Sequence, residues 1–256
     1  MVIQHMHTAF RRTAGISVAL ATLCAGMVIA APNAANAAPA GTGSPQLPKA
    51  TRIQMIAFQQ TWNTIAEECG RTYGPEGIRY VEVSPPQESI RGTPWRTSYQ
   101  PVSYRLDSKL GTEAEFKAMV EQCNATGVGI IADVVLHQTT GSDVAAGEQT
   151  GVAGTRYNGT TGDYPGFTGE SNRYPDGVTA ADFHDYDNGA NISDYKNQQE
   201  VQEGRLSSMW DFDTSSEKVR QIQSDYLTKL YNMGVQGFRM DEVKHVNNED
   251  MKAIKD

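Results

Sequence analysis

The stretch that decides the fold reads Gly-Val-Gln-Gly-Phe-Arg-Met-Asp-Glu-Val-Lys-His from Gly234 to His245. Apolar and polar residues alternate after a glycine-rich turn, which is typical of a β-strand. The alternation places Arg239 and Asp241 on one face of that strand. Opposite charges at the end of a buried strand are costly unless they pair. Lys244 and His245 follow in a loop, and loops that follow strands often carry functional residues. The stretch therefore indicates a functional strand end, although a surface ion pair would give the same spacing.

A second stretch, Gly-Val-Gly-Ile-Ile-Ala-Asp-Val-Val-Leu-His from Gly127 to His137, is an almost continuous apolar run with one acid inside it. Such runs are typical of parallel strands that are covered on both faces. The acid, Asp133, needs a partner in that setting. Arg239 is the obvious candidate, so we expect the two strands to be neighbours.

The rest of the chain alternates expected strands with expected helices. Thr112 and Glu115 have the spacing of a capping box at the start of one helix. Alternating strands and helices indicate an α/β fold of parallel β/α units. A (β/α)8 barrel needs eight such units, and about four are recognisable, so we expect an incomplete barrel that belongs to a longer protein. The expected strands span residues 52–58, 80–83, 128–135 and 238–241, and the expected helices span 61–69, 112–125, 217–231 and 248–256.

Between the third strand and the next helix, residues 137–210 form a segment rich in Gly, Thr, Asn, Asp and Tyr. This segment is far too long for an ordinary loop between a strand and a helix. We therefore expect a small irregular domain inserted after the third strand. The resulting division is a signal peptide at 1–37, the first part of a barrel at 38–136, the inserted domain at 137–210 and the continuation of the barrel at 211–256.

The first 37 residues have the features of a secretory signal peptide. Arg11 and Arg12 precede an apolar run at residues 16–30 that is too short to favour a membrane span, and Ala35-Asn36-Ala37 offers a small-x-small cleavage site. We expect a secreted, extracellular protein with no membrane contact after cleavage. The net charge of −8 becomes more negative when the two leader arginines are removed. That balance argues against a nucleic-acid partner.

Cysteine usage leaves two alternatives open. Of the three cysteines, Cys24 lies in the leader, while Cys69 and Cys123 lie in expected helices. An oxidising compartment permits a disulfide between them. Two buried free thiols fit the sequence equally well.

Two further motifs accompany the two strand motifs. They are Val-Ser-Pro-Pro-Gln-Glu from Val83 to Glu88 and Trp-Arg-Thr-Ser-Tyr-Gln-Pro-Val-Ser-Tyr from Trp95 to Tyr104. Together the four motifs resemble secreted α-amylases of the actinobacterial and animal type, over residues 51–256. The resemblance implies a (β/α)8 TIM barrel with a small domain, domain B, inserted after the third strand.

The resemblance also implies retaining hydrolysis of α-1,4-glucosidic bonds in starch, glycogen or maltooligosaccharides. Retaining glycosidases need a carboxylate nucleophile and a second carboxylic acid about 5–5.5 Å away. Asp241 matches the nucleophile, and Arg239 would hold it ionised through a charge-assisted bond. The general-acid Glu and a later His-Asp pair of the family would lie beyond residue 256, and Glu249 and Asp250 are too close to Asp241 to replace them. We therefore expect no hydrolysis by this chain alone.

For substrate binding, the resemblance implies flat rings and polar groups around the nucleophile. Trp95 and Tyr99 would stack on sugar rings, and Gln100 would bind a hydroxyl. Lys244 and His245 would contact the sugar on the leaving-group side. The further candidates are Asp133, which would also buttress Arg239, and Tyr195, whereas Tyr157 and Tyr164 are expected to pack.

Two positions near this site depart from the family. Arg96 replaces a second aromatic residue, which removes one stacking surface. Glu242 replaces a usually small residue, and it is expected to point away from Asp241 if the strand continues.

The resemblance further implies a calcium ion that joins the inserted domain to the barrel, and a chloride ion is compatible with it. The calcium ligands would be the Asp211 side chain and the backbone carbonyls of His245 and Gln202. The family's remaining ligand is an Asn, and His137 occupies that position here. Imidazole is a poor calcium ligand, because calcium prefers oxygen. Gln138 stands where the family has a substrate-binding His.

Two other functions are compatible with these departures. One is a glucan-binding protein without catalysis, and the other is a transglycosylating or isomerising member of the same superfamily. In each case the resemblance implies a protein that is monomeric when full length.

Overall fold

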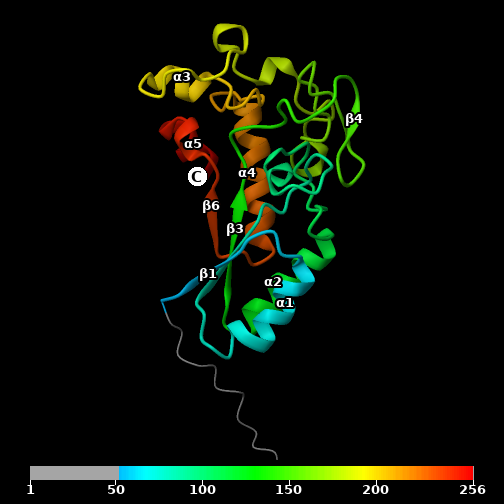
Figure 1. Ribbon diagram of the computed structural model, residues 1–256, viewed down its shortest axis with the longest axis vertical. Coiled ribbons are helices and arrows are strands. Elements are labelled where there is room, and N and C mark those ends of the chain that lie inside the picture. The colour runs from blue at the N-terminus through cyan, green and yellow to red at the C-terminus, as the bar shows by residue number, and fades with distance from the viewer. Residues whose placement is uncertain (1–51, 256) are drawn as a thin grey trace, which may run out of the picture. The chain divides into compact units, whose positions relative to one another are not determined.

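The computed structural model describes residues 52–255, so the expected signal peptide lies outside the described residues. Four strands form one parallel sheet in the order β1-β2-β3-β6 (Figure 1). Their bounds are Gln54–Ala57 for β1, Tyr80–Val83 for β2, Gly129–Val134 for β3 and Gly237–Met240 for β6. All four expected strands are confirmed; β2 has the expected ends, and the ends of the other three differ from the sequence-based ranges by one or two residues.

The strand register brings the two sequence motifs together. β3 and β6 are neighbours, and Asp133 is the direct partner of Arg239 across the pair. β3 is buried along most of its length, as its apolar run predicts. The turn into β6 depends on Gly234, whose φ of 97° is rarely adopted by other residues. Register and turn together fix where the charged end of β6 lies.

The helices follow the expected order, with informative differences at their ends. Helix α1 (Trp62–Glu68) continues directly into a π-helical turn, η1 (Cys69–Tyr73), so the helical segment extends beyond the expected range of 61–69. Helix α2 (Glu113–Ala125) begins with the expected capping box of Thr112 and Glu115. Helix α5 (Asn248–Lys255) is preceded by Asn247, whose Oδ1 accepts the Glu249 amide at 2.9 Å and so satisfies one donor of the first turn.

A disulfide joins the first two helical segments. Cys69 and Cys123 are bonded, which settles the alternative that the sequence left open. Helices α1 and α2 pack together, and α2 also contacts β3. Trp62 and Phe116 are fully buried between them, with ring centroids 5.2 Å apart. Burying one such ring contributes about 1.5–3 kcal/mol, so this pair anchors the helices to the sheet.

Helix α4 (Glu217–Asn232) carries the apolar stripe that the sequence predicts. Its Tyr226 stacks on Tyr104 with ring centroids 4.3 Å apart. Tyr226 also donates its hydroxyl proton to Gln87 Oε1 at 2.9 Å, which satisfies a buried polar group. The stripe residues that are buried are Val219, Ile222, Tyr226, Leu227 and Leu230.

Residues 137–210 form mostly irregular structure between β3 and α4 (Figure 1). They contain a two-stranded antiparallel pair, β4 (Gln149–Thr150) and β5 (Arg156–Tyr157), and a short helix, α3 (Gln198–Glu203). Tyr157 and Tyr164 are buried and stacked, as expected for packing residues. The division of the chain at 137 and 210 remains a prediction.

One buried acid ties this segment to the sheet. Glu88 is fully buried and accepts the Ser103 hydroxyl at 2.6 Å and the amides of Ala153 and Thr155 at 2.9 and 3.1 Å. A buried carboxylate with several donors is satisfied rather than strained. The Val-Ser-Pro-Pro-Gln-Glu motif therefore ends in a structural anchor.

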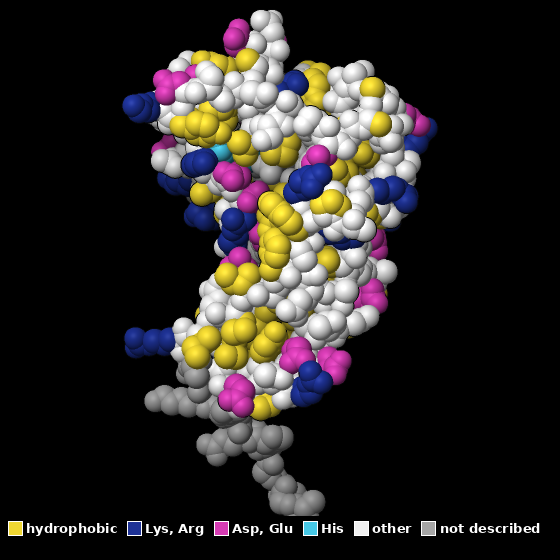
Figure 2. Space-filling view, in the orientation of Figure 1, with side chains coloured by type: hydrophobic (Ala, Val, Ile, Leu, Met, Phe, Trp, Pro, Cys, Tyr) yellow, Lys and Arg dark blue, Asp and Glu magenta, His cyan; other side chains and the backbone are white. Residues whose placement is uncertain are grey.

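Apolar side chains are exposed along β1 and just after it. Met55, Ile56 and Phe58 are 37%, 64% and 49% exposed. Figure 2 shows hydrophobic side chains gathered on the visible face, with acidic and basic side chains interspersed around them. Among residues 52–255, no helix is long and apolar enough to cross a bilayer.

Candidate active site

The candidate site lies at the carboxyl ends of β3 and β6, where barrel proteins place their functional groups. Arg239 Nη1 donates to both oxygens of Asp133, at 2.9 and 3.1 Å, and to Asp241 Oδ1 at 2.6 Å. The Asp133–Arg239 pair expected from the sequence is therefore present. Asp133 is only 3% exposed and Asp241 only 8%, so the two carboxylates are largely removed from water, whereas the Arg239 side chain is 43% exposed.

The electrostatics of the cluster follow from its burial. Burial raises the pKa of Asp133 to about 6, even though bonds from Arg239 and Tyr99 act to lower it. Burial acts against the charged form of Arg239, but the two carboxylates raise its pKa above the ordinary value. The Tyr99 hydroxyl donates to Asp133 Oδ2 at 2.8 Å. Burial, together with the Asp133 charge, raises the pKa of the Tyr99 hydroxyl. Tyr99 is therefore held as a neutral donor.

Gln138 holds the second oxygen of Asp241. Its Nε2 donates to Asp241 Oδ2 at 3.3 Å and to the Tyr99 carbonyl at 3.1 Å. Both oxygens of Asp241 thus have a donor, one from a guanidinium and one from an amide. Sequence reasoning missed this role, because it considered Gln138 only as a substitute for a substrate-binding His.

A cavity of about 410 Å³ opens beside this cluster, which is within the usual size range of ligand sites. Trp95 is 57% exposed on its wall, with its ring 5.7 Å from Tyr99 and 6.0 Å from Phe58 between centroids. The lining residues expected from the sequence are Trp95, Tyr99, Gln100, Arg239 and Asp241, joined by Arg96, Gln138, Asp143, Leu206, Met209 and Glu242 among others.

Asp143 organises the opposite part of the wall. It accepts two bonds from Arg96, at 2.9 and 3.3 Å, and one from Gln100 Nε2 at 2.7 Å. Gln100 Oε1 in turn accepts the Gly141 amide at 3.1 Å. The amide of Gln100 is therefore already engaged by protein groups. Asp143 carries no sequence signal of this role, since it lies in the irregular segment.

Glu242 lies differently from its sequence-based expectation. The strand ends at Met240, and Glu242 has a left-handed backbone with φ 45° and ψ 34°. Because the strand does not continue, the side chain lines the cavity instead of pointing away from Asp241. Its carboxylate lies 3.6 Å from Lys244 Nζ and 3.4 Å from His245 Nε2.

Three expected substrate contacts, Tyr195, Lys244 and His245, form a second group beside the cavity and do not line it. Lys244 Nζ lies 5.4 Å from the centroid of the Tyr195 ring, and the His245 ring lies 6.4 Å from it. Tyr195 is 56% exposed, whereas His245 is buried. Burial and the nearby His137 lower the pKa of His245. Tyr195, Lys244 and His245 therefore group together, and the Glu242 carboxylate links Lys244 and His245 to the cavity wall.

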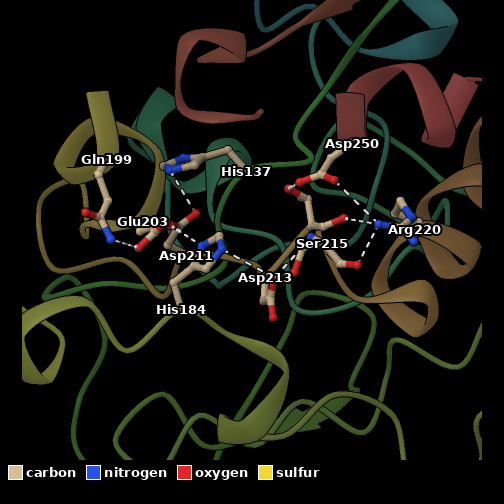
Figure 3. Close-up of polar contacts among 10 residues, drawn as sticks. His137, His184, Gln199, Glu203, Asp211, Asp213, Ser215, Arg220 and Asp250 are labelled. Atoms are coloured by element: carbon tan, nitrogen blue, oxygen red, sulfur yellow. Dashed lines mark hydrogen bonds and ion pairs between the residues drawn. The ribbon is translucent and has the colours of Figure 1, made fainter. Parts of the chain in front are cut away.

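The expected calcium ligands meet at a histidine cluster instead. Asp211 is 1% exposed; its Oδ1 lies 3.1 Å from His137 Nε2, and its Oδ2 lies 2.9 Å from His184 Nδ1 (Figure 3). The His245 ring stacks on His137 with centroids 4.6 Å apart. His245 Nδ1 lies 2.7 Å from the carbonyl oxygen of Val201. Val201 of α3, which is next to Gln202, therefore contacts the histidine cluster.

This donor set does not fit calcium. Calcium takes six to eight oxygen ligands, but both oxygens of Asp211 already face imidazole nitrogens. Over the described part of the chain, no three His, Cys, Asp or Glu side chains converge as metal ligands would. Burial acts to lower the pKa of His184, but the bond and charge of Asp211 raise it above its ordinary value. His184 had no sequence signal and was missed.

Four parallel strands with a cavity at the carboxyl ends of β3 and β6 fit the architecture of a TIM-barrel protein, of which the described residues form an incomplete part. The family described as "Alpha amylase, catalytic domain" matches residues 95–255. The chain therefore belongs to the alpha-amylase family, as its four motifs indicate.

Relatives and solved structures agree with this assignment. The chain is 38% identical over 199 residues to an alpha-amylase of Pecten maximus, covering 77% of this chain and 38% of that protein. It is 37% identical over 203 residues to an alpha-amylase of Streptomyces violaceus, covering 79% of this chain and 32% of that one. The structure of wild-type alpha-amylase I from Eisenia fetida matches with a TM-score of 0.73 and 34% identity, over 83% of this chain and 42% of that chain. The chain thus spans about a third to two fifths of the length of these relatives.

Proposed function

We propose that this chain provides the nucleophile half of a retaining glycosidase site for α-1,4-glucans such as starch, glycogen and maltooligosaccharides. The observation that carries this proposal is the clamp on Asp241, whose two oxygens accept bonds from Arg239 and Gln138. Two such bonds, one of them from a guanidinium, fix the orientation of a carboxylate. Asp241 also lines the cavity, where an anomeric carbon could reach it.

The residues of this chain would act as follows. An oxygen of Asp241 attacks the anomeric carbon and forms a covalent glycosyl intermediate as the glycosidic C–O bond breaks, and the leaving oxygen of the sugar takes a proton from a general acid. Asp133 is committed to Arg239 and Tyr99, and Glu242 faces Lys244 and His245. We therefore assign no general acid among residues 52–255, and we expect this chain alone not to hydrolyse natural glucans.

The cavity wall suits a pyranose ring. Trp95 presents a large exposed face, and Tyr99 supports it edge-on. Aromatic faces offer apolar area together with a fixed geometry. Lys244 and Tyr195 lie to one side and would contact a sugar beyond the cleaved bond, whereas the buried His245 would support them from beneath. We also propose that the protein is secreted, from its leader sequence, and acts as a monomer when full length.

The sharpest test bypasses the missing acid. A glycosyl fluoride needs no protonation of its leaving group, so Asp241 can displace fluoride unaided. We would incubate the chain with 5-fluoro-α-maltosyl fluoride, in which the second fluorine slows breakdown of the intermediate, and digest it for mass spectrometry. We expect an added 5-fluoromaltosyl group on Asp241. The C–F bond breaks as the new C–O bond forms, and fluoride leaves as an anion.

Two variants make the result decisive. Asp241→Asn should show no adduct, whereas Asp176→Asn, which changes an exposed acid in the irregular segment, should label normally. Absence of an adduct from the unmodified chain, or an adduct on another residue, would contradict the proposal. If the chain also stays on insoluble starch without forming the adduct, the alternative of a glucan-binding protein is supported. Product analysis of the full-length protein with maltooligosaccharides separates transfer from hydrolysis.

A further inference from the structure

Asp211 lies where the irregular segment returns to the sheet. Its backbone bridges to Gln138, just after β3, and its carbonyl accepts the His184 amide at 2.9 Å. The Phe212 amide donates to the His137 carbonyl at 2.9 Å. The carboxylate of Asp211 is therefore buried at the junction between two parts of the chain. A buried carboxylate must be compensated by donors or by a cation.

The compensation comes from imidazoles of this chain. Each oxygen of Asp211 has an imidazole nitrogen within ion-pair distance, His137 on one side and His184 on the other. His184 Nε2 also lies 3.4 Å from Asp213 Oδ1, which extends the chain of contacts seen in Figure 3. The carboxylate thus has an imidazole on each side, and protein side chains occupy the space around both of its oxygens.

His137 is fixed in place by its neighbours. Gln138 Nε2 faces two acceptors, Asp241 Oδ2 and the Tyr99 carbonyl, so Gln138 Oε1 must be the atom that faces His137. His137 Nδ1 lies 2.6 Å from that oxygen and therefore donates to it. The His245 ring covers His137. With Nδ1 donating and the ring covered, Nε2 faces Asp211 Oδ1 at 3.1 Å, and it can donate to that oxygen only when the ring carries a proton on both nitrogens.

We propose that His137, His184 and His245 replace a bound calcium ion at this junction, so that the stability of the protein does not depend on calcium. An oxygen-bearing side chain at position 137 would complete a cation site, whereas imidazole fills the space and pairs with Asp211 directly. This inference concerns stability alone and does not rest on the proposed catalytic function.

The test is thermal unfolding of the purified chain in EDTA and in millimolar CaCl2. We expect the same midpoint in both, and no heat of binding when Ca²⁺ is titrated in by calorimetry. His137→Asn should unfold roughly 5 °C lower in EDTA, because one oxygen of Asp211 loses its partner. Ca²⁺ should restore part of that loss. His137→Ala, the matched control, should lose as much but gain nothing from Ca²⁺, because it offers no oxygen ligand.

Several results would overturn the inference. A midpoint of the unmodified chain that falls in EDTA or rises with Ca²⁺ would show that a cation is still needed. A rise with Zn²⁺, which binds imidazole well, would show that the cluster is itself a metal site. His137→Asn with unchanged stability would show that imidazole does not compensate Asp211. If that variant fails to fold, the comparison of the unmodified chain with and without EDTA still decides.

Discussion

Arg239 Nη1 and Asp241 Oδ1 are 2.6 Å apart, although the two residues belong to the same strand end and are separated by only one residue. The same nitrogen reaches both oxygens of Asp133 on the neighbouring strand. One guanidinium nitrogen therefore serves two carboxylates from adjacent strands. Its position is set by backbone register, so the orientation of Asp241 is fixed before any substrate binds.

Replacing Arg239 should destabilise the fold. In Arg239→Gln, the buried Asp133 loses its charged partner, which costs 3–5 kcal/mol for fully buried pairs. Because the Arg239 side chain is 43% exposed, we expect a smaller loss of about 2 kcal/mol in the free energy of unfolding. Urea denaturation measures this loss. The control is Arg105→Gln, whose exposed pair with Asp107 at 3.4 Å should contribute less than about 1 kcal/mol. Equal losses in the two variants would contradict the prediction.

Asp133 should leave a pH signature in stability. Its folded pKa of about 6 lies above the ordinary value for aspartate, so the folded state binds this proton more tightly than the unfolded state. Its contribution to the free energy of unfolding therefore grows as the pH falls from about 6 to about 4, and it is lost as the pH rises through 6. Other carboxyl groups act in the opposite direction. The measurable quantity is thus the difference in stability between the unmodified chain and Asp133→Asn, which should increase towards pH 4. A difference independent of pH would argue against this assignment.

Gln138 should position the nucleophile. In Gln138→Ala, Asp241 Oδ2 loses its amide donor, and hydrogen bonds to charged groups are worth about 1.5–3 kcal/mol. We expect labelling of Asp241 by the fluoride reagent to slow roughly tenfold or more. Gln138→Glu, which keeps the size but removes the donor, should slow labelling at least as much. Thermal midpoints recorded alongside separate positioning from damage to the fold. Unchanged labelling in both variants would remove Gln138 from the site.

The disulfide should contribute strongly to stability. Cys69 and Cys123 are 54 residues apart, and closing a loop of that length stabilises a protein by about 4 kcal/mol in the chain-entropy description. We expect urea unfolding of the unmodified chain to shift to lower concentration in reductant. The double variant Cys69→Ser, Cys123→Ser should be equally destabilised and insensitive to reductant. If reductant leaves the transition of the unmodified chain in place, the bond is not stabilising.

The sequence predicted those parts of the fold that depend on local periodicity. The strands follow from apolar alternation and from the uninterrupted run around Asp133. The pairing of Asp133 with Arg239 follows because neighbouring parallel strands end at the same edge of a sheet. The capping box of α2 follows from Thr112 and Glu115 alone. These features need no knowledge of distant contacts.

The parts that the sequence could not predict depend on how the irregular segment returns to the sheet. Asp143 meets Arg96 across 47 residues, and His184 meets Asp211 across 27. No periodicity specifies such contacts. The prediction for the Glu242 side chain was wrong for a local reason: its left-handed backbone ends the strand earlier than the alternation of apolar and polar residues suggests. The cysteine pair likewise needed the packing of α1 on α2 to be known.

The bond between Cys69 and Cys123 closes a covalent ring that contains β2 and the cavity wall at Trp95, Tyr99 and Gln100. A protease that cut the backbone once inside this ring would not release either piece. The nicked protein would migrate as one species on a non-reducing gel and as two after reduction. The aromatic wall would thus stay attached to the sheet after a single cut, which suits a protein proposed to work outside the cell.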